Sequence, residues 1–392
     1  MLPGPGTGVR PGGRNDTGRV RTRDRSRLTG VDVARGVALL GMVAVHVLPQ
    51  TEADGSATTV GLVASGRSAA LFAVLAGVGL ALTADRWRLR GRLALVLRAV
   101  GVGAVGLLLG TLDSGVAVIL AYYAVLFVLV LPFLDLRARP LLVLAGTWAL
   151  VLPVVSFLVR DELVAPTRDN PEWSSLGDAG PLASELLVTG YYPALPWLAY
   201  LLLGLGVGRL ALRSTRVALR IAASGAGIAL LAHGSSAVLL GPLGGAERIG
   251  ATLGLPPGDQ LDGLLDQGRF GNVPTGTAWW LAVDAPHTTT PLDLAATGGT
   301  ALLVLGLALL VASRVALLLA PLAAIGSMPL TLYTTHVAVL SVVDDADPET
   351  SYLVQVAVGV VFAVLWRRHV GRGPLEAALA VLTRPVSGRS RT

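Results

Sequence analysis

Cysteine is absent from this chain of 392 residues, and so is lysine, since all 31 basic residues are arginine. Without a thiol, disulfides, thiolate nucleophiles and cysteine-ligated metal sites are excluded. Charged residues are scarce at 14%, whereas soluble domains contain about 25%. Hydrophobic residues reach 53% and fill many long runs, which predicts an all-α, polytopic bundle of transmembrane helices.

Windows of about 19 residues predict about ten membrane-spanning helices, and counts of nine or eleven stay open. Their approximate ranges are 29–49, 64–84, 93–110, 115–134, 139–159, 191–211, 217–240, 293–312, 320–342 and 351–368. The N-terminal segment and the loops after every second span carry arginine, whereas the remaining loops are acidic or neutral. Because arginine collects on the cytoplasmic side, this alternation predicts that both termini are cytoplasmic.

The net charge of +6 therefore reflects topology. Arginines that are distributed over cytoplasmic loops do not form one basic surface, so we expect no nucleic acid partner. The expected partner is the lipid bilayer, and the expected location is the plasma membrane, with several passes. The sequence leaves the oligomeric state open, a homo-oligomer included.

The domain organisation is predicted from composition and loop length. Residues 1–26 are rich in Gly, Pro and Arg, which predicts a disordered cytoplasmic tail. A transmembrane domain follows at 27–370, and 371–392 form a second cytoplasmic tail. Two outer loops, 160–190 and 241–292, are too long for simple connectors, and loops of such length are usually functional or disordered.

The first predicted span contains polar residues at both ends, two near the cytoplasm and one near the outer face. Asp32 and Arg35 lie three residues apart, which places them on one helix face near the cytoplasm. They can form an interfacial ion pair, or they can hold an anionic part of a cofactor. His46 lies eleven residues after Arg35, about 16 Å further along the helix axis and near the outer face.

Four of the five histidines, His46, His233, His287 and His336, fall on the outer side of the membrane in this topology. Histidine suits proton transfer near neutral pH and can also accept an acyl group. Each of them has a plainer interpretation: His46 as a hydrogen-bonded group in the bundle, and His287 as an exposed loop residue. The case for His233 is the weakest.

Arg67 begins the second span on the outer side, against the general arginine distribution. It can bind a carboxylate or phosphate in bidentate fashion, or extend to the membrane interface. Trp279 and Trp280 in the second long loop suit sugar faces as well as membrane interfaces. Metal-ligand spacing is missing, as are Walker, Rossmann and nucleophile-elbow patterns, so no metal is expected.

The segments that hold these residues resemble a known family. They are RLTGVDVARGVALLGMVAVHV, GRSAALFAVLAGVGLAL, YYPALPWLAYLLLGLGVGR, WWLAVDAPHTTTPLDL and IGSMPLTLYTTHVAVL. Together they resemble the transmembrane acyltransferases related to heparan-alpha-glucosaminide N-acetyltransferase, in particular the bacterial YeiB-like branch. The resemblance covers most of residues 27–370.

This resemblance implies transfer of an acyl group, typically acetyl from cytosolic acyl-CoA, to a hydroxyl or amine acceptor outside, such as a small molecule or an envelope glycan. It also implies a histidine in the outer part of the early spans, for which His46 is the candidate. His336 or His287 would be a second proton-transfer group.

Three further roles complete this hypothesis. Arg67 would orient an anionic part of the substrate, Trp279 and Trp280 would shape the acceptor site, and Asp32 and Arg35 would hold the helix or a CoA phosphate. Two alternatives remain open: a transporter or exporter whose pathway these groups line, and a non-catalytic envelope scaffold.

Overall fold

The computed structural model describes residues 28–53, 55–83, 89–165, 168–269, 271–343 and 347–387. Residues 385–387 are described by their backbone alone. The predicted disordered tail, 1–26, lies outside these ranges. Regular structure in the described ranges is helical, with one isolated β-bridge between Thr51 and Ala57. The all-α prediction is therefore confirmed.

The helices are bounded as follows. They are α1 (Thr29–Val47), α2 (Thr59–Ala64), α3 (Arg67–Ala81), α4 (Leu89–Gly110), α5 (Leu120–Leu129), α6 (Ala138–Val159), α7 (Ala179–Ser184), α8 (Ala194–Gly208), α9 (Thr215–Leu240), α10 (Gly245–Leu253), α11 (Asp259–Asp266), α12 (Pro291–Ala312), α13 (Ala320–Ile325), α14 (Pro329–Leu340), α15 (Pro348–His369) and α16 (Pro374–Ser387). Short 3₁₀ or π turns are η2 (Leu131–Phe133), η3 (Arg160–Glu162), η4 (Ser174–Gly177), η5 (Glu185–Thr189) and η6 (Ala278–Ala282).

Seven helices in the described part of the chain are long and apolar enough to cross a membrane. An eighth span results when Ala179–Thr189 and Ala194–Gly208, which meet at a bend of 50°, are taken together. The predicted spans 115–134 and 320–342 contain shorter helices instead. Helix α5 has 10 residues, or about 15 Å, and ends just before the turn η2 with its Pro132. A break before Pro329 separates α13 from α14.

The centre of the bundle is built by close approach of helix backbones. Helix α3 packs along α8, α12 packs along α9, and α1 contacts α3, α12 and α13. A Cβ on Gly77 of α3 would lie 2.2 Å from the carbonyl oxygen of Leu201, and one on Gly204 of α8 would lie 1.8 Å from that of Val74. Only glycine permits this close contact of helix backbones.

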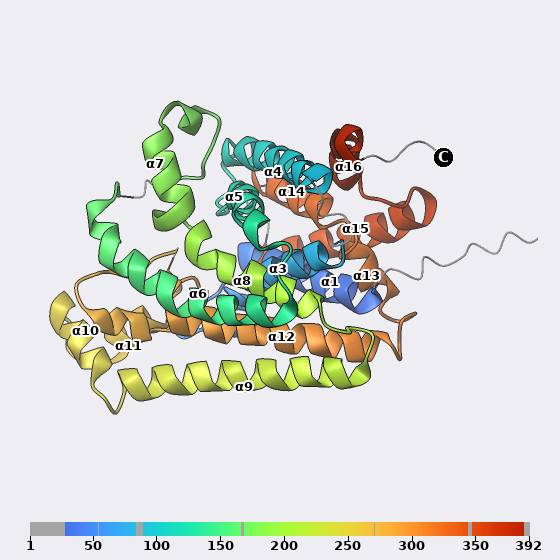
Figure 1. The fold of residues 1–392 in the computed structure, drawn as a ribbon. Coiled ribbons are helices and arrows are strands. Elements are labelled where there is room, and N and C mark those ends of the chain that lie inside the picture. Colours follow the sequence, from blue (N-terminus) through green and yellow to red (C-terminus); the bar gives the residue numbers. More distant parts are fainter. Residues whose placement is uncertain are drawn as a thin grey trace, which may run out of the picture.

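The two ends of the bundle differ. Figure 1 shows the bundle on its side, with α10 and α11 of the second long loop at the left end and α7 of the first above them. The opposite end carries α13, α15 and the C-terminal helix α16. The two long predicted loops therefore gather at one end, where they contain short helices of their own.

Helix α16 occupies most of the segment predicted as a C-terminal tail, and the sequence analysis did not predict it. It packs against α4 and α14. Its Glu376 carboxylate accepts hydrogen bonds from the backbone N–H groups of Leu330 (2.8 Å) and Thr331 (3.2 Å), and from the Thr331 hydroxyl (2.6 Å). These N–H groups open α14, so Glu376 caps the helix that carries His336.

Candidate functional site

Two histidines that are 290 positions apart meet in the bundle. His46 lies in the last turn of α1, and His336 lies in the middle of α14. The His46 Nδ1 atom lies 3.1 Å from the His336 Nε2 atom, and the two rings are nearly parallel, with centroids 5.3 Å apart. The two strongest histidine candidates from the sequence thus form one hydrogen-bonded pair.

A glutamine on the neighbouring helix α15 fixes the direction of this hydrogen bond. Gln355 Oε1 lies 2.7 Å from His336 Nδ1, and Gln355 Nε2 donates to the Ser351 hydroxyl at 3.0 Å. With Gln355 in this orientation, neutral His336 carries its proton on Nδ1 and accepts at Nε2, so His46 donates from Nδ1. The free electron pair of His46 then resides on Nε2, as a general base requires.

His46 adjoins a small cavity of about 20 Å³, the size of one or two heavy atoms. Its polar lining comes from five segments that are distant in sequence, and includes His46, Ser68, Tyr192, His287 and Tyr333. Because His287 lines the same cavity, the structure brings all three predicted histidines to one place.

His287 sits in a strained turn directly before α12. Its φ is +57°, and Thr289 has φ +54°, both in the left-handed region that costs a non-glycine residue energy. The turn is held at α12, where Asp293 accepts from Thr289 N at 2.9 Å and Thr290 caps the helix. The His287 ring stacks on Trp197 with centroids 6.2 Å apart. Burial lowers the pKa of His287 to about 4, which keeps this loop imidazole neutral at pH 7.

Arg67 opens α3 between two residues, Gly66 and Ser68, that line the small cavity. Its own side chain interacts electrostatically with Asp293 and Asp284. Arg67 therefore lies beside the histidine cluster, and a role in orienting an anionic substrate stays a prediction.

Asp32 and Arg35 form an ion pair near the opposite end of α1. Arg35 Nη1 lies 3.4 Å from Asp32 Oδ1, and Arg35 Nη2 lies 3.4 Å from the carbonyl oxygen of Leu75 on α3. A Cβ on Gly79 would lie only 2.7 Å from Arg35 Nη2, so glycine leaves room for the guanidinium. The pair links α1 to α3, and contact with a CoA phosphate stays a prediction.

Trp279 and Trp280 lie in η6, away from the lining of the small cavity. Trp280 is 1% exposed and packs in the apolar core of the second long loop. Trp279 stacks with the Arg248 guanidinium, 4.8 Å from the ring centroid. Both residues make their contacts within the second long loop. Their role in shaping an acceptor site stays a prediction.

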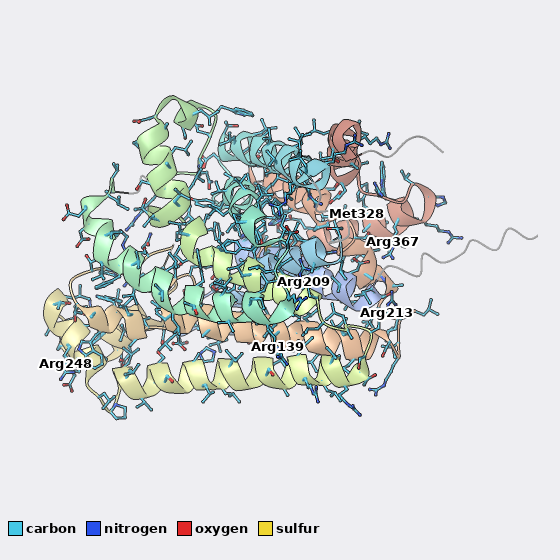
Figure 2. The ribbon with its side chains drawn as sticks, in the orientation of Figure 1. Arg139, Arg209, Arg213, Arg248, Met328 and Arg367 are labelled. Carbon is cyan, nitrogen blue, oxygen red and sulfur yellow. The ribbon has the colours of Figure 1, made fainter. Side chains whose placement is uncertain are left out.

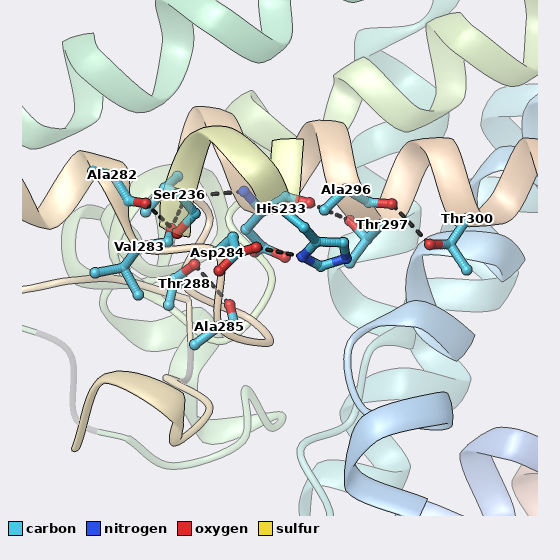
Figure 3. A network of polar contacts seen from close by, with 12 residues as sticks. His233, Ser236, Ala282, Val283, Asp284, Ala285, Thr288, Ala296, Thr297 and Thr300 are labelled. Carbon is cyan, nitrogen blue, oxygen red and sulfur yellow. Dashed lines mark hydrogen bonds and ion pairs between the residues drawn. The ribbon is translucent and has the colours of Figure 1, made fainter. Parts of the chain in front are cut away.

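His233 has a partner that the sequence analysis did not find. Figure 3 shows His233 on α9 bonded to Asp284, close to Ser236, which donates to the carbonyl oxygen of Ala282 at 2.7 Å. The two residues lie 51 positions apart, and no local spacing connects them. This pair joins α9 to the second long loop and does not line the small cavity.

Within the ranges that the structure describes, no group of three or more His, Cys, Asp or Glu side chains is placed to hold a metal ion.

Comparison with known proteins gives one family. The profile described as heparan-alpha-glucosaminide N-acetyltransferase, catalytic, matches residues 27–240, which include Asp32, Arg35, His46 and Arg67. A search of curated proteins finds no match. The matched segment covers more than half of the chain and begins where the first helix begins, so the protein belongs to the heparan-alpha-glucosaminide N-acetyltransferase catalytic-domain family.

Proposed function

We propose that this protein is an acyltransferase of the plasma membrane that moves an acyl group from cytosolic acyl-CoA to a hydroxyl or amine acceptor outside the cell. The observation that carries the proposal is the hydrogen bond between His46 and His336 beside a cavity that His287 also lines. Membership of the acetyltransferase family makes acetyl the first acyl group to test.

The proposed topology has ten crossings and both termini in the cytoplasm. In this arrangement α5 with η2, and α13 with α14, complete the two crossings that lack a helix of full length. Arginine placement supports it: Arg213 and Arg367 lie toward the end that holds α16, whereas Arg248 lies at the end of the long loops (Figure 2). The end with α16 then faces the cytoplasm, and the histidine cluster lies toward the outside.

In the proposed reaction, His46 acts as a general base. The acceptor oxygen or nitrogen attacks the thioester carbonyl carbon while His46 Nε2 takes its proton. The new C–O or C–N bond forms, the C–S bond breaks, and the proton passes from His46 to the departing CoA sulfur. His336 Nε2 accepts from His46 Nδ1–H throughout, which stabilises the transient imidazolium.

Asp32 and Arg35 define the donor side of this proposal. About 16 Å of helix separates Arg35 from His46, so an acyl-CoA at the cytoplasmic face must extend its thioester into the bundle. The Arg35 side chain is 24% exposed, which leaves part of the guanidinium accessible to a phosphate. Arg67 would orient an anionic part of the substrate from the other side.

The test is acyl transfer in proteoliposomes that contain the purified protein. Radiolabelled acetyl-CoA is supplied with glucosamine as an amine probe and glucose as a hydroxyl probe, and both labelled product and free CoA are measured. We expect activity that His46→Ala and His336→Ala abolish. His233→Ala is the matched control, because that histidine lies outside the cavity.

The same assay separates the proposal from its alternatives. CoA release that is unchanged in both cavity variants would contradict the proposed chemistry. Probe flux without any CoA release would indicate a transporter. If instead His46 carries the acyl group covalently, acid-quenched protein will retain label before acceptor is added, and kinetics will be ping-pong.

A further inference from the structure

A second and much larger cavity lies at the end of the long loops. Its volume is about 630 Å³, within the range of about 300–1,000 Å³ that small-molecule sites occupy. The first long loop contributes Arg160, Arg168 and Glu185, and the second contributes Arg269 and residues 272–275. No function considered above uses this cavity.

Two arginines of the lining, Arg168 and Arg269, come from different loops and lie close enough to repel each other. Burial and the charge of Arg168 both lower the pKa of the Arg269 guanidinium. Over the residues that the structure places, neither arginine forms an ion pair with a carboxylate. Two such cations in the lining of one cavity suit a phosphate or carboxylate.

The same cavity contains a buried carboxylate that lacks a partner. Glu185 in η5 is 9% exposed, and its Oε1 atom accepts no hydrogen bond from any residue in the described ranges. A buried acceptor without a donor is costly, so it indicates a missing hydroxyl or amine. The Tyr191 ring lines the cavity near both features and offers a flat apolar face to a sugar.

Consecutive residues line the outer cavity and the histidine cavity. Gly190 and Tyr191 line the large cavity, whereas the next residue, Tyr192, lines the small one. In the second long loop, Gly271 N donates to the carbonyl oxygen of His287 at 2.8 Å. Gly271 has φ +90°, and a Cβ there would lie 1.9 Å from the Gly190 carbonyl oxygen, so glycine brings the loops together.

We propose that the outer cavity binds the acceptor, and that this acceptor is an anionic sugar or similar polyol. Its phosphate or carboxylate pairs with Arg168 and Arg269, and one of its hydroxyl or amine groups donates to Glu185. The identification of this ligand as the acceptor rests on the proposed acyltransferase function. The binding of an anionic polyol in the outer cavity does not depend on that function.

Binding is tested by calorimetry on the protein in nanodiscs of phosphatidylcholine, which has no net charge. The probes are glucose 6-phosphate, glucuronate, neutral glucose and inorganic phosphate. We expect the two anionic sugars to bind and glucose to bind at least tenfold more weakly. Arg168→Gln and Arg269→Gln should each raise the Kd of glucose 6-phosphate at least tenfold.

Two further variants make the test specific. Arg248→Gln removes the same charge from the second long loop outside the cavity, and should leave the Kd unchanged. Glu185→Gln should weaken the binding of glucose 6-phosphate. It should not weaken the binding of inorganic phosphate, which contacts only the arginines. Thermal unfolding of each variant checks that the fold persists.

Equal binding of glucose and glucose 6-phosphate, or equal losses in Arg248→Gln and Arg269→Gln, would overturn the proposal. So would displacement of glucose 6-phosphate by anionic phosphatidylglycerol in the nanodisc, because the cavity would then hold a lipid headgroup. In His46→Ala protein the sugar phosphate should still bind while transfer is lost. Binding without any transfer in the unmodified protein would contradict the enzyme function alone, and transfer with an unchanged KM in Arg269→Gln would contradict the cavity assignment alone.

Discussion

Two histidine pairs of this protein differ in partner, burial and position. His233 pairs with the carboxylate of Asp284, yet its side chain is 39% exposed and lies outside the small cavity. His46 pairs with another histidine, whose side chain is 5% exposed, and adjoins the cavity. A carboxylate partner is typical of catalytic histidines. In this protein it belongs to His233, which lies outside the cavity, and not to His46, which adjoins it.

The comparison also separates two uses of a proton. Like charges repel strongly at hydrogen-bond distance, so His46 and His336 share at most one additional proton and act as a single base. The Asp284 carboxylate instead holds the His233 ring and links α9 to the second long loop. The first pair suits proton transfer, whereas the second suits attachment of a loop.

The largest expected difference between the pairs is in activity. His46→Ala removes the base and should lower acyl transfer by roughly 10²–10⁴-fold. His233→Ala should change the rate by less than about threefold, since its contact is a surface ion pair. Single-turnover transfer of labelled acetyl groups measures both. A similar loss in the two variants would remove the distinction on which the proposed site depends.

The next effect concerns Gln355, which orients the buried pair. Gln355→Leu removes the acceptor for His336 Nδ1–H and should lower kcat by roughly tenfold, about the free energy of one hydrogen bond. Because the variant also frees the tautomer, the pH profile of kcat should shift. Ser351→Ala is the graded comparison, since it removes the hydroxyl that holds the Gln355 amide but leaves Oε1 available to His336 Nδ1, so its effect should be smaller. An unchanged pH profile in Gln355→Leu would contradict the positioning role.

A smaller effect concerns stability at acidic pH, through His287. Its pKa is about 4 in the folded protein and 6.5 for the free side chain. Between pH 6.5 and 4 the His287 side chain therefore binds a proton in the unfolded chain but not in the folded protein. The free energy of unfolding consequently decreases as the pH falls from about 6.5 to 4. We expect Tm to fall by roughly 3–5 °C over this window on account of His287. His287→Gln should reduce the slope.

The matched measurement uses His233→Ala over the same pH window. That variant lacks His233 and keeps His287, so the acid-dependent decrease in Tm should persist. If both histidine variants flatten the pH dependence equally, burial of His287 is not its cause.

The smallest expected effect is the stability of the His233–Asp284 contact itself. Because both side chains are partly exposed, His233→Ala should cost no more than about 1 kcal/mol at pH 6. Thermal unfolding at low and high salt measures it, and the difference should shrink as salt screens the pair. A loss of several kcal/mol would mean that the contact organises the second long loop.

Several features could be predicted from the sequence because they depend on composition or local pattern. Hydropathy identifies the membrane helices, and the motif around Asp32, Arg35 and His46 identifies the family. Hydropathy alone does not detect the break between α13 and α14, because apolar residues continue across it. A window therefore reports one span where the chain forms two short helices.

The contacts of the site lie beyond a single sequence for a different reason. His46 meets His336 across 290 positions, and His336 meets Gln355 on another helix. These pairings depend on how helices are arranged around one another, which no local spacing encodes. The outer cavity was missed for the same reason, since Arg168 and Arg269 belong to two loops whose meeting is a property of the fold.

The Glu376 cap on α14 has a practical consequence for anyone who shortens or labels this protein. A chain that ends before Gly373 loses the carboxylate that holds the first turn of α14, and His336 lies less than two turns further along that helix. Trimming the C-terminus to improve crystals would then degrade the histidine site. An affinity tag is better attached after Thr392, where α16 remains intact.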